Sequence, residues 1–121
     1  MGRTAHSDLV EAILGTFGAM PGLRLWKQPV GVGVAPSGTH VNRYGIKGMA
    51  DISGILAPNG RRVEIEVKTG TGRCSGEQRA WATMVAHHGG LYVEARRIED
   101  VRKALYEAGT LVEKGLGDGG T

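Results

Sequence analysis

Apolar residues recur at helical spacing near the N-terminus of the chain. Ser7 has a side chain typical of a helix N-cap, and an apolar stripe follows it. The residues of this stripe are Leu9, Val10, Ile13, Leu14 and Phe17. Gly18 and the Pro21-Gly22 pair are typical helix terminators. The first part of the chain is therefore expected to form one amphipathic helix that packs on the rest of the protein.

A period of two is clearest in the middle of the chain, where it predicts a strand over residues 62–68. The alternating residues are Val63, Ile65 and Val67 on one face and Glu64, Glu66 and Lys68 on the other. Shorter apolar segments predict strands over 23–28, 51–56 and 91–94. The Pro58-Asn59-Gly60 sequence between two of these strands is typical of a hairpin turn.

Two further helices are predicted in the second half of the chain. The first covers residues 75–88, where Ser75 and Gln78 form a capping box. Its apolar stripe consists of Trp81, Met84, Val85 and His88. The second covers 98–108 and ends before Gly109. The expected fold is thus α/β, with a short mixed β-sheet flanked by helices and an additional C-terminal helix. It forms a single domain over residues 1–114, and a disordered tail over 115–121.

Composition and charge indicate the number of turns, the kind of partner and the location of the protein. Glycine accounts for 21 of the 121 residues, which indicates many turns, and segment 29–48 is expected to be a mobile basic loop. The formal net charge of +3 suits an anionic partner. Cys74 is the single cysteine, so no internal disulfide can form, and no apolar segment reaches the length of a membrane span. We expect an intracellular, cytoplasmic protein with no membrane partner.

The charged face of strand 62–68 carries the first candidate chemistry. A two-residue turn at Asn59-Gly60 would place Asp51 opposite Lys68 and Ser53 opposite Glu66, on one side of the sheet. Two carboxylates beside a lysine can hold Mg²⁺ or Mn²⁺ and hydrolyse a phosphodiester bond. The alternative from alternation alone is a solvated strand face with an ion pair across the strands.

A family resemblance bears on this alternative. The sequence Gly48-Met49-Ala50-Asp51, a hairpin and then Glu66-Val67-Lys68 resemble the D…ExK core of the PD-(D/E)XK nucleases. Gln78 follows the lysine by ten residues, in the opening turn of a predicted helix. The ordered set is similar to the virus-type replication–repair nuclease (VRR-NUC) domain. The resemblance implies a restriction-endonuclease-like αβββαβ core.

The resemblance also implies roles for individual residues. Asp51 and Glu66 match the metal ligands, and Val67 matches a position whose main-chain carbonyl also contacts metal. Lys68 matches the catalytic lysine and Gln78 the active-site glutamine, although Gln78 could instead only cap its helix. The family uses another acid from its first helix, and here Asp8 and Glu11 both remain candidates, with Glu11 slightly favoured.

Other chemical groups have weaker patterns. Glu64 is expected at the surface or behind the metal ligands. The histidines and Cys74 show no zinc-binding spacing, and no P-loop motif is present, so neither zinc nor a nucleotide cofactor is expected. Four basic residues are expected to contact DNA phosphates, and these are Arg43, Lys47, Arg73 and Arg79.

The expected function is therefore that of a Mg²⁺- or Mn²⁺-dependent DNA endonuclease. Stand-alone members of the family resemble homodimeric Holliday-junction resolvases, often from bacteriophages, so the resemblance implies a homodimer acting on branched DNA. The main alternative is a non-catalytic nucleic-acid-binding module. A restriction-type enzyme that reads a sequence is a further alternative, in which segment 29–48 would contact the bases.

Overall fold

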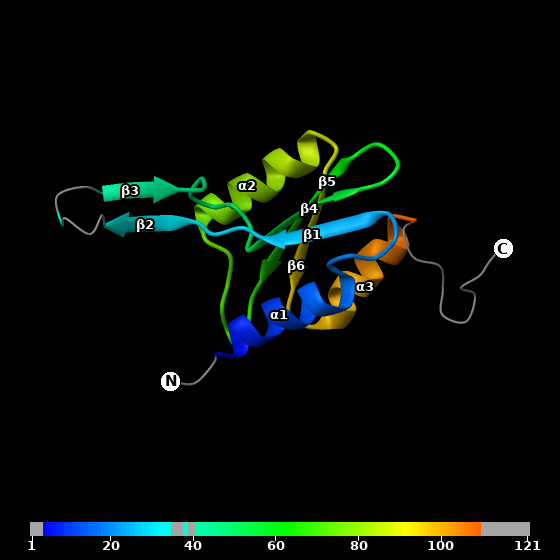
Figure 1. Ribbon diagram of the computed structural model, residues 1–121, viewed down its shortest axis with the longest axis horizontal. Helices are drawn as coiled ribbons and strands as arrows, with labels where there is room; N and C mark the ends of the chain where they lie inside the picture. The colour runs from blue at the N-terminus through cyan, green and yellow to red at the C-terminus, as the bar shows by residue number, and fades with distance from the viewer. Residues whose placement is uncertain (1–3, 35–37, 39–40, 110–121) are drawn as a thin grey trace.

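The helices and strands are seen in a computed structural model that describes residues 4–34, 38 and 41–109 (Figure 1). The helices of this part of the chain are α1 (Ala5–Phe17), α2 (Gly76–His87) and α3 (Ile98–Glu107). Its strands are β1 (Leu23–Lys27), β2 (Gly31–Val34), β3 (Val41–Tyr44), β4 (Ile52–Leu56), β5 (Arg61–Val67) and β6 (Leu91–Ala95). The tail expected over 115–121 lies outside the described residues. None of the described helices combines the length and the hydropathy needed to cross a membrane.

The main sheet has four strands in the order β1-β4-β5-β6. Strands β1, β4 and β5 pair antiparallel, whereas β5 and β6 pair parallel and are joined through α2. Helices α1 and α3 pack together beneath the sheet in Figure 1, and α2 lies on its other side. The predicted α/β class with a mixed sheet is therefore confirmed.

The hydrophobic core lies between the sheet and the α1–α3 layer. Its strand side is the apolar face of β5, where Val63, Ile65 and Val67 are fully buried. The first helix contributes the stripe expected from its sequence, and Phe17 is among the largest fully buried side chains. Helix α1 begins earlier than predicted, because Thr4 is its N-cap and Ser7 completes the capping box three residues later. Both residue types are good N-caps, so spacing alone did not distinguish them.

Helix α2 starts as predicted but packs differently. Ser75 is the N-cap and forms the expected capping box with Gln78. Of the predicted apolar stripe only Val85 is buried, whereas Met84 and His88 are exposed. The reason is that α2 faces the charged side of β5 instead of the apolar core, where its Gln78 and Trp81 donate hydrogen bonds to the acids of that strand.

Segment 29–48 contains an antiparallel strand pair, so the prediction of a loop was wrong. Strand β2 pairs with β3 in a separate two-stranded sheet, with Gly31 opposite Tyr44. The pair extends away from the main sheet (Figure 1). Glycines alternate with valines in β2, which weakens the usual signal of a strand.

The predicted hairpin is present, but its register differs by two residues. Leu56 pairs with Arg61 and Ser53 pairs with Glu64, so four residues, 57–60, form the turn. Extending this register by one step places Asp51 opposite Glu66 and not opposite Lys68. A shift of two residues keeps every side chain on its original face of the sheet. The predicted pairs were wrong, but Asp51, Glu66 and Lys68 still share one face.

Candidate active site

Asp51 lies directly before β4, at the point where β4 and β5 separate. Its carboxylate oxygen Oδ2 accepts a hydrogen bond from the main-chain N–H of Val67 at 2.8 Å. The preceding loop turns through Gly48, which has a φ of +97°. A Cβ atom on Gly48 would lie 2.5 Å from the carbonyl oxygen of Glu77, so only glycine lets this loop approach the start of α2. The close contact places Asp51 beside the last residues of β5.

Glu66 points from β5 toward α2, and its side chain is only 3% exposed. Its Oε2 accepts a hydrogen bond from Gln78 Nε2 at 2.9 Å and lies 3.3 Å from Lys68 Nζ. Its Oε1 is buried and has no hydrogen-bond partner among the described residues. Burial, and secondly the nearby charge of Asp51, raises the pKa of Glu66 to about 7. A buried acid with one unpaired oxygen is therefore held next to a second acid.

Lys68 and Gln78 complete this cluster. Lys68 Nζ donates a hydrogen bond to Gln78 Oε1 at 2.9 Å. The same oxygen accepts a hydrogen bond from the main-chain N–H of Ser75 at 2.8 Å. Gln78 therefore caps its helix and also contacts Glu66 of β5 and Lys68, the residue that follows β5. Capping and participation in the site, which were alternatives for Gln78 from the sequence, occur together.

The first helix reaches the cluster through a histidine. His6 Nε2 lies 3.2 Å from Asp51 Oδ2. The preferred acid, Glu11, instead forms an ion pair with Lys27 at 3.0 Å. Asp8 is exposed, and the cavity beside Asp51 is lined by His6 and by neither acid. His6 was missed as a site residue, although His6, Val10, Ile13 and Phe17 follow one helical stripe that faces the sheet.

Glu64 was expected at the surface or behind the ligands, and a surface position is wrong. Its side chain is fully buried between the sheet and α2. It accepts hydrogen bonds from Ser53 Oγ at 2.9 Å, Trp81 Nε1 at 2.8 Å and Arg62 Nε at 2.6 Å. The indole of Trp81 thus attaches the middle of α2 to β5, and this attachment helps to hold Gln78 over Glu66.

The four basic residues expected to contact DNA fall into two groups. Arg43 is exposed on β3, and Lys47, which follows β3, is 83% exposed and lies 3.5 Å from Glu77. Arg73 and Arg79 lie at the start of α2 and line a different cavity, to which Gln78 also contributes. Lys47, Arg73 and Arg79 therefore lie beside α2 near the site, whereas Arg43 lies on the projecting β2–β3 pair.

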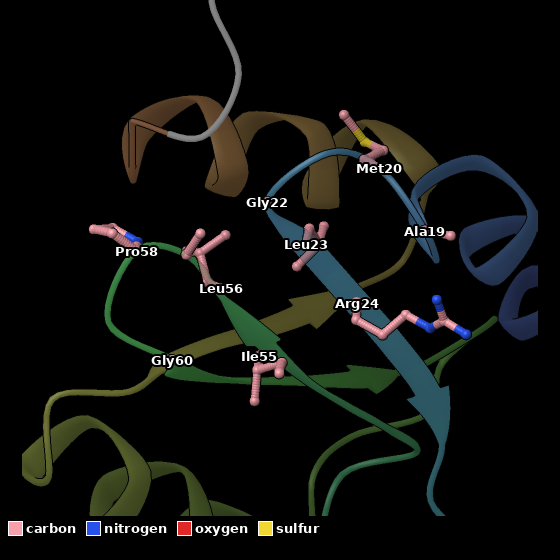
Figure 2. Close-up of a pocket in the computed structure, with 10 residues that line it drawn as sticks. Ala19, Met20, Gly22, Leu23, Arg24, Ile55, Leu56, Pro58 and Gly60 are labelled. Atoms are coloured by element: carbon pink, nitrogen blue, oxygen red, sulfur yellow. The ribbon is translucent and has the colours of Figure 1, made fainter.

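A separate cavity of about 480 Å³ lies at the other end of β4 (Figure 2). It is formed by the start of β1 and the β4–β5 turn, with Leu23, Arg24, Ile55 and Pro58 around it. None of the clustered acids, lysine or glutamine lines it. The predicted site residues thus lie at the Asp51 end of β4 and not at this cavity.

The donor set allows a test of whether a divalent cation suits the site. No group of three or more His, Cys, Asp or Glu residues that could hold a metal occurs in the described ranges. Asp51 and Glu66 would therefore need additional oxygen ligands from the main chain, water or a phosphate, as Mg²⁺ sites commonly use. The unpaired Oε1 of Glu66 fits a nearby cation, and so does the raised pKa of this group, which burial and secondly the charge of Asp51 cause. The residues present are thus compatible with Mg²⁺ or Mn²⁺.

Comparison with known proteins adds no family assignment. No protein-family model matches the chain, and no curated protein shows significant similarity to it. The resemblance to nucleases consequently depends on the motif residues and on their arrangement. These residues converge as described, through direct contacts between Glu66, Lys68 and Gln78.

The raised pKa of Glu66 predicts a pH-dependent difference in stability. The folded protein retains the Glu66 proton up to about pH 7, whereas the unfolded chain loses it near 4.5. Between these values folding takes up a proton, so Glu66 makes the protein less stable as the pH rises. We expect the Tm of Glu66→Gln minus that of the wild type to increase as the pH is raised from about 5 to about 7, in buffer without divalent cations. A difference in Tm that is constant across this range would contradict the prediction.

Proposed function

We propose that the protein is a metal-dependent DNA endonuclease of the PD-(D/E)XK type, similar to VRR-NUC domains. The observation that carries the proposal is the contact between Gln78 and both Glu66 and Lys68, at the end of β5 that Asp51 also contacts. These are the motif residues of the family, and they come from three separate segments. A solvated strand face would not bury Glu66 and leave one of its oxygens unpaired.

The order of elements supports the same proposal. When β2 and β3 are set aside, the chain order is α1, β1, β4, β5, α2, β6. This is the αβββαβ order expected for a restriction-endonuclease-like core. The β2–β3 pair is then an insertion between the first two strands of that core, and α3 is an addition after it.

Each site residue has a task in phosphodiester hydrolysis. Asp51 and Glu66 would hold Mg²⁺ or Mn²⁺, with the carbonyl of Val67 as a further oxygen. The bound ion would supply Lewis-acid chemistry at the phosphate. The ammonium group of Lys68 would stabilise negative charge that develops on the phosphate oxygens. Gln78 keeps Lys68 and Glu66 in fixed positions, because it contacts both side chains and is itself fixed by its helix cap.

We further propose branched DNA as the substrate and a homodimer as the active form. The positive net charge and the exposed Arg43 and Lys47 favour a polyanion. Two copies related by a twofold axis would present two sites to the two strands of a junction. The alternative of a binding module without catalysis accounts less well for Glu66, because a docking surface does not require a buried acid.

A panel of synthetic DNAs tests the proposal. We expect the wild-type protein to cut a four-way junction faster than a flap, a single strand or a plain duplex, in Mg²⁺ or Mn²⁺ and not in EDTA. The products are resolved on a denaturing gel, and light scattering of the purified protein reports its oligomeric state. Binding without cleavage of any of these DNAs in either metal would favour the non-catalytic module and overturn the nuclease proposal.

A further inference from the structure

A second cavity beside the site carries positive charge that the proposed chemistry does not use. It has a volume of about 260 Å³ and is lined by Arg73, Arg79 and Arg96 together with Gln78 and Tyr92. We propose that it binds a backbone phosphate of the nucleic acid, next to the phosphate that is cut. This inference deepens the proposed function and rests on it.

The three guanidinium groups are only partly neutralised. Glu94 is the carboxylate at this cavity, and its Oε2 lies 3.1 Å from Arg96 Nη2. Arg96 is otherwise held by the main-chain carbonyls of Gly70 and Gly72, and Arg79 by the carbonyl of Cys74. Carbonyl contacts orient a guanidinium without removing its charge. The cavity therefore keeps a net positive charge.

Arg73 is available for a ligand. Within the described part of the chain it makes no hydrogen bond or ion pair, and it is exposed at the edge of the cavity. Arginine presents several N–H donors in a plane, a geometry that matches two oxygens of one phosphate. Arg73 and the unused donors of Arg79 therefore suit a phosphate better than a single-atom anion.

A second observation also indicates a ligand with acceptor oxygens. The hydroxyl of Tyr92 is buried at this cavity and lacks a hydrogen-bond partner among the described residues. Burial and nearby acids, Glu66 first among them, raise the pKa of Tyr92, so its hydroxyl keeps its proton. A phosphate oxygen would accept the hydrogen bond that Tyr92 cannot make within the described structure.

The position of Gln78 relates this cavity to the cleavage site. Gln78 lines both this cavity and the one beside Asp51, while its side chain contacts Glu66 and Lys68. An anion held by the arginines would thus lie next to the position where the scissile phosphate meets the acids. A neighbouring phosphate of the same strand is the occupant that follows from this geometry.

The salt dependence of DNA binding measures this contact directly. We expect Arg73→Gln to weaken binding of a four-way junction several-fold in EDTA and to lower the slope of log affinity against log salt concentration by about 0.7 to 0.9. Arg96→Gln should do the same, but it also removes contacts to the Gly70–Gly72 loop, so Arg73→Gln is the cleaner variant. Arg97→Gln is the matched control, because Arg97 lies outside the cavity and faces Asp100. Equal slopes for Arg73→Gln and the wild type would overturn the inference.

The single cysteine provides a second measurement in the unmodified protein. Cys74 lines the cavity and is partly exposed, so its alkylation rate reports whether the cavity is occupied. We expect junction DNA to slow alkylation several-fold in the wild type and less in Arg73→Gln. Protection by inorganic phosphate that DNA does not increase would indicate a free-anion site and overturn the strand-phosphate assignment. All these measurements omit divalent cations, so they distinguish a failure of this inference from a failure of cleavage.

Discussion

We expect the Lys68→Ala variant to cut DNA at least about 100-fold more slowly than the wild type, with little change in DNA affinity. The Lys68 ammonium group is mostly buried beside Glu66 and Gln78, where it can act on developing phosphate charge. The basic residues at the α2 cavity line a separate space and are proposed to bind a different phosphate, so they would not replace Lys68. Single-turnover cleavage of a junction in Mn²⁺ measures the chemical step, and a gel-shift assay in EDTA measures binding.

Two other variants are compared with Lys68→Ala, one in the site and one outside it. Asp51→Asn should show a similar loss of cleavage, because the amide retains the size of the side chain but not its charge. Lys103→Ala removes an exposed lysine of α3 and should leave the rate unchanged. Wild-type rates for both Lys68→Ala and Asp51→Asn would show that the active site has been assigned to the wrong residues.

The largest expected effect on stability is at Glu64. Replacing Glu64 with alanine should lower the free energy of unfolding by about 3 kcal/mol, because it leaves the buried hydroxyl of Ser53 and the partly buried indole N–H of Trp81 without their acceptor. Arg62 is partly exposed and can turn toward water, which limits the loss. Urea unfolding measures the effect as a lower midpoint with an unchanged m-value.

Matched variants separate burial from charge at this position. Glu64→Gln keeps one acceptor oxygen and should cost less than Glu64→Ala. Glu107→Ala removes an exposed acid at the end of α3, where we expect a change within about 0.5 kcal/mol. If Glu64→Ala destabilised the protein no more than Glu107→Ala, the buried network would contribute nothing to stability.

The sequence predicted the elements of the main sheet better than their pairing. Alternation along β5 identified its two faces, and the capping box at Ser75 located the start of α2. The hairpin register could not be predicted, because Pro58-Asn59-Gly60 is compatible with turns of different length and the sequence does not state which residues belong to the turn. Strands β2 and β3 were missed, because the glycines of β2 give no apolar alternation.

The candidate site was predicted where residues are close in sequence and less well where they are not. Glu66 and Lys68 share a face by strand geometry alone. Glu64 follows the same pattern, but its burial depends on Trp81, which reaches it from a different element. His6 was missed because the predicted helix began after it, so His6 was not counted among the residues of the helical stripe that faces the sheet. The acids of α1 were considered instead, and Glu11 is engaged with Lys27.

The pairing register of β4 and β5 limits how such a chain can change during evolution. A slip of one residue would turn Asp51 toward the apolar core and bring Ile52 beside Glu66, which removes the acid pair and exposes a core side chain. A slip of two residues would keep Asp51 and Glu66 on one face and Ile52 in the core, with Asp51 no longer directly opposite Glu66. Viable relatives should therefore differ in this register by even steps, while the length of the turn at 57–60 varies freely at the end of β4 remote from Asp51. A functional descendant with an odd step would need a compensating β-bulge in one of the two strands.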